Sequence, residues 1–137
     1  NPKDIEAYCR HYEGMIKEAG GIDIQILGIG TNGHIGFNEP ADELKPYTHH
    51  IQLATSTIEA NARFFSSKDN VPRSAITMGM HSILQAKRIL LLATGGTKAP
   101  IVKKLLHPAI STRVPASLLW LHDNVQIYVD DQAAPSS

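Results

Sequence analysis

Two apolar runs, residues 22–27 and residues 88–93, predict buried strands. Residues 88–93 are Arg-Ile-Leu-Leu-Leu-Ala, a run typical of a strand that is buried on both faces of a parallel sheet. Because a strand at a sheet edge is exposed along one side, we expect both runs to lie in the sheet interior. Further strands are predicted at residues 47–53, 74–78, 118–121 and 125–129.

Helices are predicted where apolar residues recur every three or four positions. The first of these stretches starts close to Pro2 and Asp4, which favour a helix N-terminus, and stops at the glycine pair 20–21. Strands that alternate with helices indicate an α/β fold, a mostly parallel layered sheet with flanking helices in the Rossmann-like manner. The other helices are predicted at residues 56–65, 79–86 and 99–106.

The composition indicates one globular domain without a strong electrostatic field. The chain has 137 residues, of which 42% are apolar, enough for a sizeable core. The 13 basic and 13 acidic side chains cancel, so no attraction to nucleic acid or to a membrane surface is expected. Cys9 is the single cysteine, which excludes an internal disulfide. No apolar stretch reaches the roughly 20 residues of a membrane span, and no signal peptide is recognised, so the expected location is the cytoplasm.

The side chains best suited to chemistry lie in one glycine-rich segment, residues 27–40, directly after the first apolar run. The segment reads Leu-Gly-Ile-Gly-Thr-Asn-Gly-His-Ile-Gly-Phe-Asn-Glu-Pro. Glycines at this density permit a close approach of the backbone to a ligand, and open α/β sheets bind ligands beyond the carboxyl ends of their strands. His34 near Glu39 can be held in one tautomer and can move protons near neutral pH. We therefore predict an active site here, with Gly30 and Gly33 among its substrate-binding residues.

Other interpretations of this segment stay open on the residues alone. Asn32 and Asn38 suit ligand hydroxyls and turn conformations equally well. An isolated His34 would more often bond loop backbone than act in catalysis. The Gly-x-Gly-x-x-Gly spacing that begins at Gly28 also matches a dinucleotide fingerprint, but this match is weak because no helix clearly follows.

Two cations lie where a phosphate can bind. Arg63 falls on the apolar face of the predicted helix 56–65, where an unpaired charge is costly and calls for a protein carboxylate or a ligand phosphate. Lys98 follows a Gly-Gly turn at the start of another predicted helix, which suits a phosphate, although a solvated lysine fits equally well. The remaining histidines have no ligand spacing, so we expect no metal site.

Residues 27–40 resemble the signature of the glucosamine-6-phosphate deaminases, which convert glucosamine 6-phosphate to fructose 6-phosphate and ammonia. The similarity continues through residues 56–65, 71–79 and 93–98, and so covers most of the chain. The related 6-phosphogluconolactonases share a Gly-x-Gly-x-Asp-Gly-His core but lack the Phe-Asn-Glu-Pro ending at residues 37–40. The resemblance therefore implies a hydrolase of amino-sugar catabolism.

The resemblance also implies a role for each matched residue. His34 would be the acid/base that opens the pyranose ring, with Glu39 orienting it. Asn32 stands where some members carry an Asp that completes a triad. Arg63 and Lys98 match the family's phosphate-binding Arg and Lys. The substrate's own carbonyl and amine act as the electron sink, so neither a metal nor an organic cofactor is implied.

Members of the family also carry an N-terminal half, with a phosphate loop and the Asp that moves a proton between C1 and C2. On this resemblance the chain is an incomplete fragment, the C-terminal part of a sugar-phosphate isomerase/deaminase-like domain at residues 1–131 with a frayed tail at 132–137. Its expected partners are a sugar phosphate and the missing half, and a homo-oligomer is left open. We do not expect the chain alone to complete the reaction. No basic residues at 42–52 match the allosteric site of hexameric members, so activation by N-acetylglucosamine 6-phosphate is not expected.

Two alternative functions are a lactonase or isomerase acting on another sugar phosphate, and a non-catalytic sensor domain for sugar phosphates. A sensor would keep Arg63 and Lys98 but would not need the pair His34 and Glu39. Because the sequence contains both sets, the enzyme is favoured.

Overall fold

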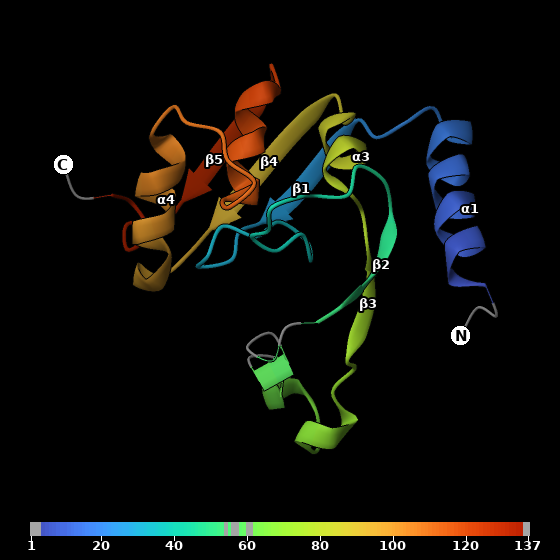
Figure 1. The fold of residues 1–137 in the computed structure, drawn as a ribbon. Coiled ribbons are helices and arrows are strands. Elements are labelled where there is room, and N and C mark those ends of the chain that lie inside the picture. Colours follow the sequence, from blue (N-terminus) through green and yellow to red (C-terminus); the bar gives the residue numbers. More distant parts are fainter. Residues whose placement is uncertain (1–3, 54, 56–57, 60–61, 136–137) are drawn as a thin grey trace.

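A three-stranded parallel sheet forms the centre of the fold (Figure 1). The structure, a computed structural model, describes residues 4–53, 55, 58–59 and 62–135. Its strands lie in the order β1-β4-β5, and β4 pairs in parallel with both neighbours. The predicted α/β fold with a parallel sheet is confirmed, and the apolar run 88–93 is the interior strand, as expected. The strands are β1 (Ile24–Gly28), β4 (Arg88–Ala93) and β5 (Val125–Val129).

Three helical segments pack against one face of this sheet, and their apolar residues form a single core with the strands. On the strands, Leu27, Ile89 and Leu91 point into this core. Side chains alternate between the two faces of a strand, so the core uses every second strand residue. In the part of the chain that the structure describes, no helix is both long and apolar enough to cross a membrane. The three segments are α3 (Met80–Leu84), α4 (Ala99–Leu106) and the 3₁₀ helix η4 (Pro115–Leu121).

Strand β1 lies at an edge of the sheet, which corrects the expectation that residues 22–27 form an interior strand. Among the described strands it pairs with β4 alone. Its residues Ile24 and Ile26, which point away from the core, are exposed. The apolar residues that predicted an interior strand are therefore in contact with solvent here.

Helix α1 (Ile5–Glu18) begins and ends close to the predicted signals. The Asp4 carboxylate accepts a hydrogen bond from the Ala7 N–H at 2.9 Å, which satisfies a free amide of the first turn. The glycine pair 20–21 adopts φ angles of 89° and 87°, and its amides close the last turn of the helix. Pro2 lies outside the described residues.

A carboxylate ties α1 to two other parts of the fold. Glu13 Oε1 accepts hydrogen bonds from the Thr48 N–H and hydroxyl, at 2.7 and 2.6 Å, and from the Ser82 hydroxyl at 2.5 Å. Burial raises the pKa of Glu13, but the hydrogen bonds from Ser82 and Thr48, together with nearby His81, outweigh it and leave that pKa below its ordinary value. An ionised Glu13 therefore links α1 to the segment before β2 and to α3.

Strands β2 (His49–Gln52) and β3 (Ser74–Thr77) form a separate antiparallel pair, within the two segments where strands were predicted. The chain that joins them contains two short 3₁₀ helices, η1 (Ala62–Phe64) and η2 (Lys68–Asn70). Figure 1 shows this green region extending away from the three-stranded sheet. We call the strand pair and the chain between them the β2–β3 arm.

The helix predicted at residues 56–65 is described only in part. The backbone is helical at residues 58–59 and forms a 3₁₀ turn at 62–64, and part of the predicted range lies outside the described residues. Arg63 does not lie on a buried apolar face, because Phe64 and Phe65 are exposed and Arg63 is exposed with them. Its Cζ atom lies 4.7 Å from the centre of the Phe64 ring, a cation–π contact. Desolvation therefore does not force Arg63 to pair with an anion here.

The prediction of a strand at residues 118–121 is wrong, because these residues belong to η4. Pro115 is fully buried at the start of η4, where its fixed φ suits a helical turn. Ala116 and Leu119, three positions apart, are both buried in the core, as the three-residue period of a 3₁₀ helix requires. A four-residue apolar run alone does not distinguish such a turn from a strand.

Residues 132–137 were predicted to be a frayed tail, and the structure describes residues 132–135 of it. Ala133 is fully buried, and its N–H donates to the Asp130 carboxylate at 2.8 Å. Both oxygens of the same carboxylate lie 3.0 Å from the Gly95 nitrogen, which donates to them. Asp130 therefore joins the end of β5 to the turn after β4 and to residue 133.

Candidate active site

The glycine-rich segment and the Gly-Gly turn at 95–96 emerge at the same edge of the sheet. The first directly follows β1 and the second follows β4, and these strands are parallel neighbours. Lys98 connects the two, because its Nζ donates a hydrogen bond to the Ile29 carbonyl at 2.6 Å. The Gly95 N–H donates a hydrogen bond to the Asp130 carboxylate, so this amide is already used within the protein. The side chain of Lys98 therefore brings a cation to the glycine-rich segment.

His34, Asn32 and Glu39 form a triangle, in which two sides are hydrogen bonds and the third is the contact between the imidazole and the carboxylate. His34 Nδ1 lies 2.8 Å from Asn32 Oδ1 and 3.4 Å from Glu39 Oε1. Asn32 Nδ2 donates to Glu39 Oε2 at 2.7 Å, and Asn32 Oδ1 also accepts the His34 backbone N–H at 3.1 Å. The imidazole and the carboxylate are each partly buried, so they are screened from bulk water but can still be reached by a small ligand.

This network assigns the imidazole tautomer of His34. The amide nitrogen of Asn32 donates to Glu39, so its oxygen faces the ring and can only accept. The proton of the neutral ring is therefore assigned to Nδ1, and the lone pair lies on Nε2. Within the described part of the chain, the triangle engages Nδ1 only, which leaves Nε2 as the atom that can exchange a proton with a ligand.

Two glycines shape the loop around the imidazole. A Cβ atom added at Gly30 would lie 2.2 Å from the His34 ring, so the ring packs directly against the glycine backbone. Gly33 has a φ of 88°, and an added Cβ would lie 2.8 Å from Val114 Cγ1. The Gly30 N–H donates to the His34 carbonyl at 3.0 Å, and the Gly33 N–H donates to the Gly30 carbonyl at 2.9 Å. Both amides are thus used within the loop.

Asn38 and Thr77 fasten this loop to the β2–β3 arm. Asn38 is buried, and its Nδ2 donates to the carbonyls of Ile35 and Met78 at 3.0 and 2.8 Å. Of the two roles left open for Asn38, this geometry favours holding the turn. The Thr77 hydroxyl accepts the Phe37 N–H at 3.1 Å. Thr77 was missed by sequence reasoning, because a threonine in a short strand run carries no signal for a contact 40 positions away.

Arg63 is not joined to this cluster by any contact recorded between described residues. It lies in η1, on the β2–β3 arm. The predicted site residues therefore fall into three places. His34, Asn32 and Glu39 lie together, Lys98 lies beside their loop, and Arg63 lies on the arm.

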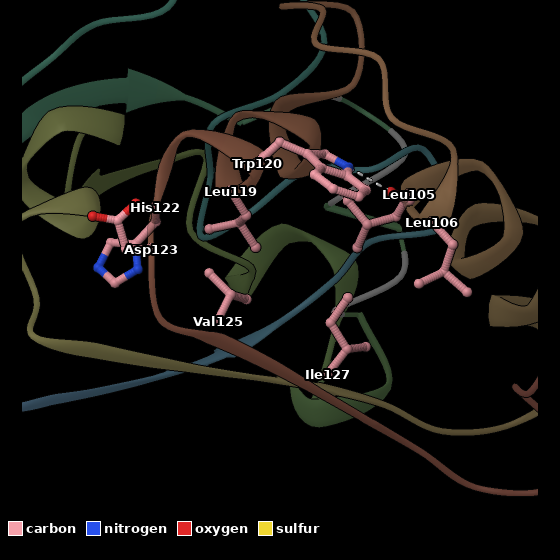
Figure 2. Close-up of a pocket in the computed structure, with 8 residues that line it drawn as sticks. All are labelled: Leu105, Leu106, Leu119, Trp120, His122, Asp123, Val125 and Ile127. Carbon is pink, nitrogen blue, oxygen red and sulfur yellow. Dashed lines mark hydrogen bonds between the residues drawn. The ribbon is translucent and has the colours of Figure 1, made fainter.

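The cavity shown in Figure 2 lies elsewhere, among α4, η4 and β5, and has a volume of about 230 Å³. Its lining is mostly aliphatic, and two of its polar side chains, Trp120 and His122, contact backbone carbonyls. Trp120 Nε1 donates to the Leu105 carbonyl at 2.8 Å, and His122 Nε2 lies 2.6 Å from the Ala86 carbonyl oxygen. This cavity is therefore separate from the predicted chemistry. Over the described ranges, no group of three or more His, Cys, Asp or Glu side chains is arranged to hold a metal ion.

Curated proteins with similar sequences are deaminases. The chain is 54% identical over 131 residues to a glucosamine-6-phosphate deaminase of Halothermothrix orenii, a match that covers 96% of this chain and 54% of that protein. It is 55% identical over 130 residues to a glucosamine-6-phosphate deaminase of a Geobacillus species, covering 95% of this chain and 52% of the relative. The chain thus spans about half the length of the curated relatives it matches.

Solved structures show the same relationship. A monomeric glucosamine-6-phosphate deaminase of the NagB superfamily superposes with a TM-score of 0.92 at 52% identity, over 97% of this chain and 55% of that one. A 6-phosphogluconolactonase from Trypanosoma cruzi shares the fold, with a TM-score of 0.67 at 18% identity over 91% of this chain and 49% of its own. A family profile described as glucosamine-6-phosphate isomerases/6-phosphogluconolactonase matches residues 1–128. With nearly its whole length matched, the chain belongs to this glucosamine-6-phosphate isomerase and 6-phosphogluconolactonase family.

Proposed function

We propose that the chain forms the ring-opening and phosphate-binding part of a glucosamine-6-phosphate deaminase. In the complete reaction, glucosamine 6-phosphate and water become fructose 6-phosphate and ammonia. The observation that carries the proposal is the triangle of contacts among His34, Asn32 and Glu39 beyond the carboxyl end of β1. The names of the relatives, which match at 54% and 55% identity, support this reaction class.

Ring opening is the step for which His34 is suited. Opening a cyclic hemiacetal removes the proton of the anomeric hydroxyl and delivers a proton to the ring oxygen as its bond to C1 breaks. A neutral imidazole with its lone pair on Nε2 accepts the first proton and returns one to the ring oxygen, so no net proton is consumed. Asn32 keeps the other proton on Nδ1, and the Glu39 carboxylate lies 3.4 Å from Nδ1, on the side of the ring away from the atom that exchanges protons.

The substrate phosphate is assigned to Lys98 and Arg63. The Lys98 ammonium has three donors, of which one is used on the Ile29 carbonyl, so two can serve an anion. Arg63 is exposed on the β2–β3 arm and offers a second cation. Because the amides of Gly30 and Gly33 are used within the loop, we assign to these glycines close approach to the sugar rather than N–H donation.

The proton transfer between C1 and C2 needs a further base. We assign that base to the part of the relatives that this chain does not match, so the chain alone does not complete the reaction. We call the unmatched part of the Halothermothrix orenii deaminase the complementary segment. The joined protein is this chain fused to that segment in the order found in the relative.

The test replaces His34 with Gln in the joined protein and compares two substrates, cyclic glucosamine 6-phosphate and an open-chain analogue. An acid–base group contributes about 10²- to 10⁴-fold, so the rate on the cyclic sugar should fall by that factor while the open-chain rate falls far less. Glu39→Gln should show a weaker form of the same selectivity. His107→Gln, an exposed histidine at the end of α4, is the matched control and should leave both rates unchanged. An unaltered ratio of the two rates in His34→Gln would remove His34 from ring opening.

A further inference from the structure

The triangle of His34, Asn32 and Glu39 is supported from two separate parts of the fold. Asn32 and His34 follow β1, and the His34 ring packs against the backbone of Gly30. Glu39 comes later in the same segment, directly after two residues that contact the end of β3. The position of the Glu39 carboxylate therefore depends on what holds the loop at residues 36–38.

The last residue of β3 and the residue after it hold two consecutive residues of this loop. The Thr77 hydroxyl accepts a hydrogen bond from the Phe37 N–H at 3.1 Å, and the Met78 carbonyl accepts one from Asn38 Nδ2 at 2.8 Å. Thr77 and Asn38 are only 6% and 2% exposed, so both contacts are shielded from water. Glu39 is the next residue of the chain, and its backbone is therefore placed by these two contacts.

Gly36 allows the loop to approach the Thr77 hydroxyl closely. Its φ is 58°, and a Cβ atom added there would lie 2.8 Å from Thr77 Oγ1. The hydroxyl also donates a hydrogen bond to the Met78 carbonyl at 3.3 Å, so its proton is used on its own segment and its oxygen accepts the Phe37 N–H. A methyl group at this place, as in valine, cannot accept that bond.

The Glu39 carboxylate in turn fixes the amide of Asn32. Glu39 Oε2 accepts a hydrogen bond from Asn32 Nδ2 at 2.7 Å, which leaves the amide oxygen facing His34 Nδ1 at 2.8 Å. A displaced carboxylate would release this amide, and a rotated amide would turn its N–H donors toward the protonated Nδ1. The tautomer of His34 therefore depends on where Glu39 is held.

We propose that Thr77 is a positioning residue for ring opening, which holds Glu39 in place through the Phe37 amide. Thr77 touches neither the imidazole nor a substrate, and it acts by keeping the Asn32 oxygen on His34 Nδ1. The proposal rests on the proposed function and deepens it, because it adds a residue of β3, outside the glycine-rich segment, to the residues that ring opening requires.

Substitutions of Thr77 in the joined protein test the proposal. Thr77→Val keeps the shape of the side chain but loses the acceptor, so the rate on cyclic glucosamine 6-phosphate should fall about ten- to hundred-fold, because small misplacements of reacting groups are costly. The rate on the open-chain analogue should fall much less, and fructose 6-phosphate should bind with wild-type affinity. Thr77→Ser restores the hydroxyl and should recover most of the lost rate. Ser74→Ala removes a hydroxyl from the start of β3, and as the matched control it should leave both rates unchanged.

A double substitution separates positioning from a general structural role. Because Thr77 acts through Glu39, Thr77→Val should lower the rate by less than about twofold when it is added to Glu39→Ala, in which the carboxylate is already absent. An equal loss with and without Glu39→Ala would overturn the proposal, because Thr77 would then act by another route. Equal losses on the cyclic and the open-chain substrate would overturn it as well.

Thr77→Ala gives the same comparison if Thr77→Val does not fold, because the smaller side chain leaves room for a water molecule at the Phe37 amide. It should show the same selectivity between the two substrates, and a wild-type rate on the cyclic sugar would overturn the proposal. Failure of the proposed function gives a different result, an unaltered ratio of the two rates in His34→Gln. If His34→Gln and Glu39→Gln change that ratio but the Thr77 variants do not, only the positioning role of Thr77 is contradicted.

Discussion

The amide of Asn32 stands between His34 and Glu39, with its oxygen 2.8 Å from His34 Nδ1 and its nitrogen 2.7 Å from Glu39 Oε2. The shortest direct distance between ring and carboxylate is longer, 3.4 Å. An amide can accept a hydrogen bond through its oxygen and donate one through its nitrogen, but it does not take up a proton itself. The Nδ1 proton is therefore retained on the ring, and proton exchange is directed to Nε2.

Removal of the Asn32 amide should break the link between His34 and Glu39. In the joined protein we expect Asn32→Ala to lower kcat for glucosamine 6-phosphate by about tenfold or more, below the full 10²- to 10⁴-fold of an acid–base group, with little change in KM. Asn32→Asp keeps an acceptor for Nδ1, so its kcat should fall less than that of Asn32→Ala. Thr31→Ala, at the exposed neighbouring position, is the control, and a wild-type kcat in Asn32→Ala would contradict the assigned role.

The phosphate assignment predicts a loss of affinity rather than of chemistry. Lys98→Ala and Arg63→Ala in the joined protein should each weaken fructose 6-phosphate binding by about ten- to hundred-fold, because a charge-assisted hydrogen bond is worth about 1.5–3 kcal/mol. Calorimetry measures the affinity directly. Lys103→Ala, an exposed lysine on α4, should bind like wild type. If Lys98→Ala alone weakens binding, the phosphate is bound beside the glycine-rich segment and the β2–β3 arm does not contribute.

The lowered pKa of Glu13 predicts how stability depends on pH. A carboxyl whose pKa is lower in the folded state contributes stability above its unfolded value of 4.5, and loses that contribution as pH falls through the lower folded value. Glu13→Gln should therefore lower the free energy of unfolding at pH 7 by about 1 kcal/mol and flatten its decline below pH 4.5. Denaturant unfolding at several pH values gives both quantities. Glu6→Gln, at an exposed position of α1, should change neither, and an unchanged acid slope in Glu13→Gln would show that Glu13 does not drive the acid loss.

For two elements with long local patterns, the sequence predicted the bounds that the structure shows. The strand at residues 88–93 and the helix at residues 99–106 match β4 and α4, because the first is a long unbroken apolar run and the second has apolar residues at helical spacing. The run 118–121 is too short for this, and it forms part of a 3₁₀ helix instead. The edge position of β1 could not be predicted, because it depends on which strands are present to pair with it and not on the composition of β1.

The structure brings the predicted residues His34, Asn32 and Glu39 together, but the sequence did not predict the contacts among them. His34 and Glu39 stand out because a proton-transfer pair within a glycine-rich segment is uncommon in a simple turn. The position of Asn32 between them depends on the loop conformation, which no local pattern specifies. The bond from Phe37 to Thr77 joins residues 40 positions apart, and it exists only because the β2–β3 arm lies against the loop.

A comparison of two glycines tests whether the packing of the His34 ring sets the rate. Neither Gly30 nor Gly28 has a positive φ, so the backbone accepts Ala at both positions. An added Cβ at Gly28 meets nothing within 4 Å, whereas at Gly30 it would lie 2.2 Å from the His34 ring. The imidazole is a side chain that can rotate away, so Gly30→Ala should keep a thermal stability close to wild type while the ring leaves Asn32. We therefore expect Gly30→Ala in the joined protein to lower the rate on cyclic glucosamine 6-phosphate by about tenfold or more, with the open-chain analogue much less affected. Gly28→Ala should match wild type on both substrates, and equal losses in the two variants would show that any added Cβ disturbs the loop and that the ring contact is not the cause.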